Sequence, residues 1–192
     1  MSTQSLSSTQ RREIISIDPS TGAEIGRVPL FAASEVSAAV KRARQAQSSW
    51  AKLSFRERSR FILMAREIVL AQVEEIATLI ARETGKPPPE AISMEVTPTL
   101  DLMQHFARNA ERMLHRQKID IGQFELMGRS SYIVYKPLGV VGIISPWNFP
   151  WATPLDEIVM ALMAGNAVVL KPSELTPFTA LKIGEVFKQA KL

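Results

Sequence analysis

Residues 145–150 combine an amide side chain with two prolines, directly after an apolar run that predicts a buried strand over residues 140–144. Open parallel sheets bind ligands beyond the carboxyl ends of their strands. Pro146 and Pro150 restrict the backbone on either side of Asn148. An amide held in this way is a hydrogen-bond donor of the kind that an oxyanion hole needs. The segment also fits a rigid turn in which Asn148 caps the local backbone. Such turns are common, so these residues taken alone favour the turn.

A second polar segment runs from Lys171 to Glu174, after a short apolar run that predicts another buried strand. Pro172 favours an extended backbone at Lys171. A lysine and a glutamate at the end of a strand fit hydrogen bonds to ribose hydroxyls or to a phosphate. They fit equally a surface ion pair, which contributes little to stability. Because the two segments extend adjacent βα units, we expect both to face one crevice.

The sequence also excludes several kinds of chemistry. It contains no cysteine, so these 192 residues hold no disulfide, no thiolate metal site and no cysteine nucleophile. The two histidines, His105 and His115, lack the spacing of a ligand pair on a helix, and we expect no metal site. Neither a G-x-G-x-x-G fingerprint nor a P-loop is present.

The charge balance predicts neither a nucleic-acid partner nor a membrane partner. There are 23 Lys and Arg residues against 19 Asp and Glu residues, a formal net charge of +4. Arg108, Arg112 and Arg116 have the spacing of one helix face, but Glu111 lies among them, which favours a solvated face. No apolar run approaches the ~18 residues of a membrane span. Residues 1–12 predict a disordered tail that lacks the apolar stretch of a secretory signal, so we expect a cytoplasmic protein.

Helical and β-prone patterns in the first half of the chain position these segments. Two β-prone runs around a Pro/Asp/Gly turn, at 13–17 and 24–28, predict a hairpin. Ser34 is expected to cap the first helix, and the capping box at residues 54–57 to start a longer one that ends at Gly85. The helices predicted in this half span residues 34–50, 55–84 and 98–117.

The second half of the chain alternates strand and helix. A helix is expected to begin at Pro154, with Thr153 as its cap and two acidic residues, Asp156 and Glu157, in its first turn. Gly165 closes that helix. The remaining predicted elements are a strand over 167–170 and a last helix that begins at Thr176-Pro177 and runs to the end of the chain. Short connections between these elements predict an α/β protein with a parallel sheet.

Two blocks of sequence resemble the aldehyde dehydrogenase superfamily. Residues 137–150, PLGVVGIISPWNFP, are similar to that family's P-x-G-V-x-x-x-I-x-P-W-N-[FY]-P block. Residues 164–177, AGNAVVLKPSELTP, are similar to its A-G-N-[AT]-V-V-x-K-P-[SA]-E-x-T-P block. Upstream, DPSTG at 18–22 and ETGKP at 83–87 lie where the family has similar segments. The resemblance runs from about Glu13 to the end of the chain.

The resemblance implies a fold and a division of the chain. The fold class is α/β, with N-terminal helices and a hairpin followed by the first βαβ units of an incomplete Rossmann-like parallel sheet. Residues 1–12 form the tail, and residues 13–117 the helical part of a cofactor-binding domain. Residues 118–138 resemble the β-hairpin that the family uses for subunit pairing. Residues 139–192 correspond to the first βαβα part of the dinucleotide-binding sheet.

The resemblance also implies an activity. The family oxidises aldehydes to acids, or to acyl-thioesters, with NAD or NADP, through attack by a cysteine and transfer of hydride to the nicotinamide. Asn148 would donate a hydrogen bond to the oxyanion of the thiohemiacetal. The remaining implied contacts are with the cofactor: Ile144, Ser145, Pro146 and Trp147 line its channel, and Lys171 and Glu174 hold the adenosine ribose, with Ser173 nearby. A glutamate there repels a 2′-phosphate, which favours NAD over NADP.

The departures from the family concern activity. The family's nucleophile and general base lie beyond residue 192, and its chains are more than twice as long. The sequence is therefore interpreted as the N-terminal part of such an enzyme, inactive alone. The alternative is a natural short protein that binds nucleotide weakly or pairs with full-length relatives. The implied partners are an aldehyde and, for the parent enzyme, further copies of itself. The implied substrate-tunnel residues, near Trp151, Asp156 and Met160, are too few to identify the aldehyde.

Overall fold

A parallel pair of strands joined by a helix forms the centre of the fold. The structure is a computed structural model that describes residues 12–192, so the predicted tail lies outside the described residues except for its last one. Strand β5 (Val140–Ile144) pairs with β6 (Ala167–Lys171) in parallel. Helix α6 (Ala152–Met163) connects the two strands, and α7 (Pro177–Gln189) follows β6. The α/β class and the βαβα order predicted from the sequence are confirmed.

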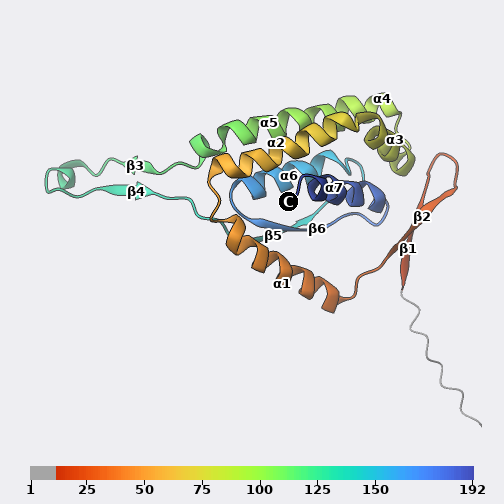
Figure 1. Ribbon diagram of the computed structural model, residues 1–192, viewed down its shortest axis with the longest axis horizontal. Coiled ribbons are helices and arrows are strands. Elements are labelled where there is room, and N and C mark those ends of the chain that lie inside the picture. The colour runs from red at the N-terminus through yellow and green to blue at the C-terminus, as the bar shows by residue number, and fades with distance from the viewer. Residues whose placement is uncertain (1–11) are drawn as a thin grey trace, which may run out of the picture.

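Helices cover both faces of this strand pair (Figure 1). Helix α1 (Ala33–Trp50) packs against one face, and α6 packs against the other. Beyond α6 lies a layer of two long helices, α2 (Phe55–Ala71) and α5 (Thr97–Met113), which pack on each other. The core lies between these layers. Its largest fully buried apolar side chains are Trp151, Ile62, Ile76, Ile80, Met103, Leu155, Met163 and Ile183.

Two hairpins project from opposite ends of the molecule (Figure 1). The first consists of β1 (Glu13–Ile17) and β2 (Glu24–Pro29), which pair antiparallel as predicted. The second consists of β3 (Gln117–Ile119) and β4 (Ser131–Ile133), with the 3-10 helix η2 (Gly122–Glu125) at its tip. No helix within residues 12–192 is long and apolar enough to cross a bilayer.

The long helix predicted after the capping box is interrupted. Ser54 does cap α2: its hydroxyl accepts from the Glu57 N–H, and the Glu57 carboxylate accepts from the Ser54 N–H. However, the helix ends at Ala71, and α3 (Val73–Thr84) begins after Gln72, whose φ and ψ of −116° and 20° are not helical. Neither glycine nor proline marks this break. Both helices pack on α7, but α2 also packs on α5, whereas α3 also packs on α4.

The helix predicted over 98–117 begins earlier and ends earlier. A short helix α4 (Pro88–Ala91) continues through a π-helical turn η1 (Ile92–Val96) into α5, which stops at Met113. The π turn ends two residues before Pro98, which has no N–H to donate within a helix. The prediction that Arg108, Arg112 and Arg116 share one helix face is therefore wrong for Arg116. Arg116 lies beyond the helix, and its guanidinium is 3.3 Å from the centroid of the Tyr132 ring.

Two predicted caps and one helix end are also wrong. Helix α1 starts after Ala32, whose N–H donates to Glu35 Oε2 at 2.9 Å, and Ser34 lies inside the helix. Helix α6 starts after Trp151, so Thr153 is inside it, and the acidic residues 156 and 157 fall outside its first turn. Helix α7 ends at Gln189. The start of α6 was missed because its cap comes from another helix, as described below.

Candidate functional site

The two polar segments singled out from the sequence lie at the same edge of the strand pair. Ile144, the last residue of β5, is in register with Lys171, the last residue of β6. The N–H of Ser145 donates to the Lys171 carbonyl at 3.1 Å, so the pairing extends one residue into the first segment. The carboxyl ends of parallel strands share one edge of the sheet. Residues 145–150 and 171–174 are thereby neighbours.

Asn148 is fixed at its backbone while its side chain remains exposed. The Asn148 carbonyl accepts a hydrogen bond of 2.9 Å from Lys86 Nζ, and the same ammonium lies 4.5 Å from the centroid of the Phe149 ring. The rigid-turn interpretation requires a hydrogen bond between the Asn148 side-chain amide and the local backbone. The structure shows no such bond within residues 12–192. The amide is therefore free to donate to a ligand.

A buried carboxylate, Glu95, closes the amino end of α6. The side chain of Glu95 is 0 % exposed, and its Oε1 lies 2.5 Å from Lys86 Nζ. Its Oε2 accepts from the N–H groups of Trp151 at 2.9 Å and Ala152 at 3.2 Å. These N–H groups have no partner inside the helix. Glu95, which lies in the π turn, therefore caps α6. It also fixes the backbone where the segment that contains Asn148 leads into this helix.

A second buried carboxylate, Glu83, closes the amino end of α7. Glu83 Oε1 accepts from the Phe178 N–H at 2.9 Å and from the Ser16 hydroxyl at 3.0 Å. Glu83 Oε2 accepts from both the N–H and the hydroxyl of Thr179, each at 2.7 Å. One carboxylate thus joins α3, α7 and the N-terminal hairpin. Helix amino ends are favourable positions for anions, and at α6 and α7 the protein's own carboxylates occupy them.

Sequence reasoning gave no role to Lys86, Glu83 or Glu95. Lys86 and Glu83 lie in the ETGKP segment, where they were noted only as part of a resemblance. Glu95 carries a usable signal. It is flanked at helical spacing by Ala91 and Thr99, which are both buried, so it is a charge on the buried face of a helix. A buried charge needs partners, which points to a structural or functional network.

The second segment forms the ion pair that the sequence left open. Lys171 Nζ lies 3.4 Å from Glu174 Oε2, and 63 % and 66 % of the two side chains are exposed. A hydrogen bond from its own backbone, with a smaller contribution from the Lys171 ammonium, lowers the pKa of Glu174. Ser173 is buried, and its hydroxyl accepts from the Leu175 N–H at 3.2 Å. The exposed pair therefore offers an ammonium and an ionised carboxylate beside Asn148's segment.

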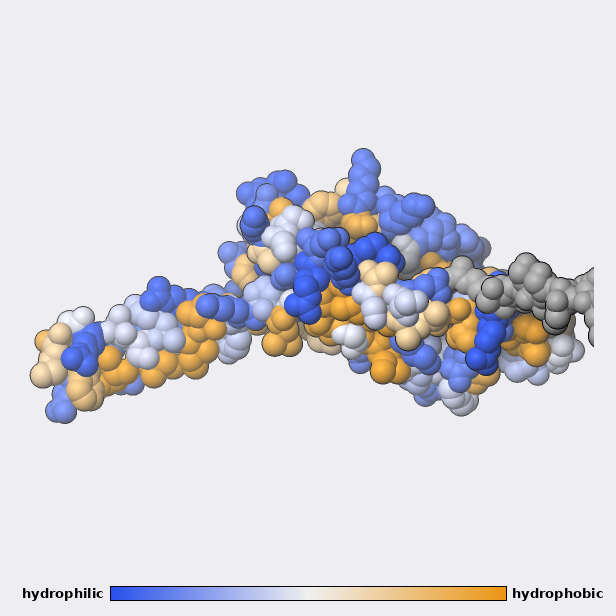
Figure 2. Space-filling view, turned by 90° about the horizontal axis from the view of Figure 1, so that it is seen from below, coloured by the Kyte–Doolittle hydropathy of each residue, from blue (hydrophilic) through white to orange (hydrophobic). Residues whose placement is uncertain are grey.

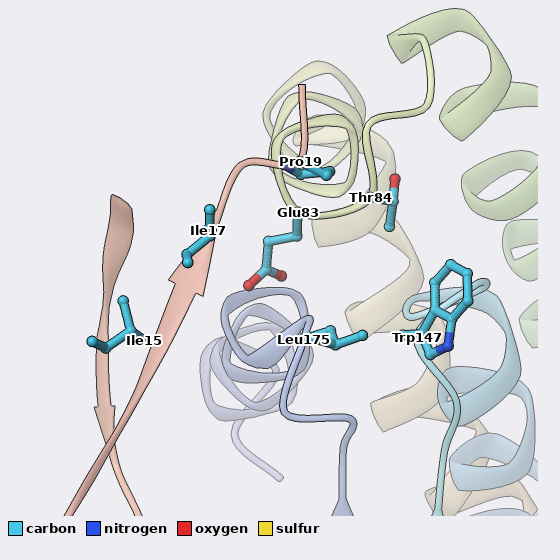
Figure 3. Close-up of a pocket in the computed structure, with 7 residues that line it drawn as sticks. All are labelled: Ile15, Ile17, Pro19, Glu83, Thr84, Trp147 and Leu175. Carbon is cyan, nitrogen blue, oxygen red and sulfur yellow. The ribbon is translucent and has the colours of Figure 1, made fainter. Parts of the chain in front are cut away.

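A shallow hollow of about 230 Å³ separates the strand-end segments from the N-terminal hairpin. Figure 3 shows Trp147 of the first segment and Leu175, which follows the second segment, on one side, with Ile15 and Ile17 on the hairpin side. Glu83 also lines the hollow, and its hydrogen bonds are satisfied within the protein. The walls are mainly apolar, so the hollow suits an apolar group and not a phosphate.

The three residues near the implied substrate tunnel differ in exposure. Trp151 is 0 % exposed and donates its indole N–H to Thr99 Oγ1 at 3.2 Å, so its side chain belongs to the core of the described residues. Met160 is exposed. Asp156 is partly buried, and its Oδ1 has no hydrogen-bond partner within residues 12–192. Burial, with a smaller contribution from Glu157, raises the pKa of Asp156 to about 6.

Comparisons with known proteins identify the family. The sequence profile of the aldehyde dehydrogenase family matches residues 6–192. The chain is 36% identical over 173 residues to a mitochondrial succinate-semialdehyde dehydrogenase of Oryza sativa subsp. japonica. The aligned residues cover 90% of this chain and 32% of the relative. The chain therefore belongs to the aldehyde dehydrogenase family, as the two sequence blocks predicted.

Solved structures agree with this assignment. An aldehyde dehydrogenase of Brucella melitensis biovar abortus 2308 superposes with a TM-score of 0.88 at 30% identity, over 94% of this chain and 36% of that one. A NAD-dependent benzaldehyde dehydrogenase of Corynebacterium glutamicum superposes with a TM-score of 0.85 at 30% identity, over 94% of this chain and 39% of that one. The chain thus spans about a third of the length of the relatives that it matches.

Proposed function

We propose that these residues form the first part of the active site of an NAD(P)-dependent aldehyde dehydrogenase. The observation that carries the proposal is the position of Asn148. Its amide is exposed at the end of β5, its backbone is fixed by Lys86, and the Lys171–Glu174 pair lies at the end of the neighbouring strand. These features support the proposal, because an exposed amide can donate to an oxyanion and an exposed Lys–Glu pair can bind a ribose.

The cofactor is proposed to lie along the edge formed by the two segments. Ile144, Ser145, Pro146 and Trp147 would line its channel, since they leave β5 beside the end of β6. Lys171 and Glu174 would hold the adenosine ribose diol, with the buried Ser173 keeping their turn in shape. NAD is favoured over NADP, because the ionised Glu174 repels a 2′-phosphate. The nicotinamide, when bound, supplies a hydride acceptor.

Asn148 is proposed to donate its amide hydrogen bond to the oxyanion that forms when a nucleophile adds to the aldehyde. The nucleophile is proposed to be a cysteine outside these residues, because the sequence contains none. By itself the chain would then lack aldehyde oxidation. The proposed location is the cytoplasm, although the rice relative is mitochondrial by name; cell fractionation tests it.

The β3–β4 hairpin supports a second candidate role, pairing with another copy or with a full-length relative. It extends away from the core, and its tip and strands expose apolar side chains (Figure 2). Leu126 is 91 % exposed and Met127 is 73 % exposed. Exposed apolar surface of this kind marks protein interfaces. This role is compatible with catalysis by the whole enzyme, and it is also the role left to a non-catalytic short protein.

The test begins with the intact mass of the native protein in its source cells. A mass at least twice the 21.3 kDa of these residues calls for an assay of aldehyde-dependent NAD⁺ and NADP⁺ reduction on the whole protein. We expect activity, with NAD⁺ preferred. A mass that matches the 192 residues, or a larger protein with no activity on aliphatic, aromatic or semialdehyde substrates, would contradict the proposal and leave the pairing role to be tested by co-purification.

A further inference from the structure

The cap of α6 contains a cation that capping does not require. At α7, Glu83 accepts from two helix N–H groups with its remaining bonds supplied by the hydroxyls of Ser16 and Thr179. At α6, Glu95 also accepts from two backbone N–H groups, but its remaining bond comes from the Lys86 ammonium. Removing an ammonium from water is costly, and a buried ion pair is by itself weak evidence of stabilisation. Capping of α6 alone therefore does not explain the presence of Lys86 beside Glu95.

The other contacts of Lys86 supply that explanation. Its Nζ donates to the Asn148 carbonyl and lies over the Phe149 ring. The carbonyl carbon is bonded directly to the Asn148 Cα, so holding the carbonyl restricts rotation about ψ at this residue. That rotation would redirect the Asn148 side chain. The pair thus fixes the entry of α6 through Glu95 and the orientation of Asn148 through Lys86.

We propose that Lys86 and Glu95 are positioning residues that orient the Asn148 amide toward the developing oxyanion, an inference that rests on the proposed function. Misplacing a catalytic group by about 1 Å can reduce the rate ~10²-fold. The pair touches the backbone around the amide and acts through it. Loss of the pair therefore lowers kcat and leaves the KM for NAD⁺ unchanged. Lys171 and Glu174 lie on the other segment, and the proposed channel residues 144–147 come before the carbonyl that Lys86 holds and are anchored by the bond from Ser145 to Lys171.

The test uses the whole protein expressed from its complete gene, with the double substitution Lys86→Met/Glu95→Gln. The pair of changes leaves no unpaired buried charge, and the glutamine can still accept from the Trp151 N–H. The matched control is Lys182→Met/Glu75→Gln, which removes another Lys–Glu pair, 2.7 Å apart and with a buried lysine, between α7 and α3. Steady-state kinetics and amide hydrogen exchange over residues 145–152 are measured for both variants.

We expect the first variant to lose about 10²-fold in kcat at constant KM for NAD⁺ and to exchange faster at residues 148–152. We expect the control to keep its kcat and its exchange in that segment. A kcat loss no larger than the control's, or a rise in KM alone, overturns the inference while the proposed function stands. An inactive wild-type protein overturns both.

A second variant isolates the contribution of Lys86. Lys86→Gln keeps a donor for Glu95, but its shorter, neutral side chain does not bridge to the Asn148 carbonyl. The same loss of kcat at constant KM is expected from it. Retention of wild-type kcat by a folded Lys86→Gln protein overturns the inference.

Discussion

Helices α6 and α7 begin in the same way and differ in what neutralises the carboxylate that caps them. Glu95 and Glu83 are both buried, both come from the N-terminal helical layer, and each accepts two backbone N–H groups of the helix it caps. Glu83 is otherwise satisfied by hydroxyls, whereas Glu95 is paired with Lys86. Capping explains both carboxylates, but of these two caps only the one at α6 includes a cation.

The difference follows the chemistry of the two segments. The α7 side presents an exposed ion pair at Lys171 and Glu174, whose long side chains adapt to a ligand. The α6 side presents one short amide, Asn148, whose direction is set by its backbone. A short side chain near reacting atoms tolerates little displacement. If Asn148 is the proposed oxyanion donor, the more costly polar network lies where orientation matters more.

The largest expected effect comes from Lys86→Met, which leaves the fully buried Glu95 without its cation. Breaking a buried pair by removing one partner costs about 3–5 kcal/mol. We expect the midpoint of urea unfolding to fall accordingly. Lys171→Met, which removes an exposed lysine, is the control and should leave the midpoint unchanged. Equal midpoints for the two variants would mean that the α6 cap does not depend on its cation.

Asn148→Ala separates function from stability at the same segment. Loss of one oxyanion donor lowers kcat about 10²–10³-fold. The side chain is exposed, so the thermal midpoint should stay close to that of the wild type. Kinetics of aldehyde-dependent NAD⁺ reduction on the whole protein measure the loss. A fall in kcat of less than tenfold would remove Asn148 from the proposed mechanism.

Glu83→Gln tests the α7 cap. The substitution replaces charge-assisted hydrogen bonds from Phe178 and Thr179 with weaker neutral ones. In addition, the NH₂ group of the glutamine then faces a backbone N–H donor. Hydrogen bonds to charged groups contribute about 1.5–3 kcal/mol, so we expect a loss within that range in the free energy of unfolding. Urea unfolding measures it. A loss larger than that of Lys86→Met would reverse the proposed order of the two caps.

Asp156 is the contrasting carboxyl on α6, because its Oδ1 lacks the donors that Glu95 and Glu83 have within the described residues. Its pKa rises from 3.8 to about 6 on folding. The folded state thus binds the proton more tightly, and this stabilisation is present below pH 3.8 and is lost as the pH rises through about 6. Partial exposure reduces the effect to about 1 kcal/mol.

The corresponding variant is Asp156→Asn, measured by thermal unfolding at two pH values. At pH 7.5 we expect its Tm to exceed that of the wild type by about 2–4 °C. Near the ordinary pKa of an aspartate the difference should disappear. An equal gain at both pH values would show that titration of this carboxyl is not its cause.

Local sequence signals predicted the central strands and their helices well. The apolar runs of β5 and β6, the turn at Gly165 with its φ of 86°, and the Thr176-Pro177 start of α7 are all local features. The break at Gln72 was missed, because neither glycine nor proline marks it. The start of α6 was missed as well, because its capping group, Glu95, lies more than fifty residues earlier in the chain.

By itself, the sequence determined the family, the order of strands and helices, and the two segments with ligand-binding chemistry. These properties depend on residue types at short spacing, which chain stereochemistry translates directly into strands, turns and helix ends. Only the tertiary structure decided which charges are buried and what they hold. The contact between Lys86 and Asn148 joins residues 62 positions apart, and that between Glu83 and Thr179 joins residues 96 apart. Such contacts form because folding withdraws these groups from water, and a buried charge must then find its partners wherever the packed chain supplies them.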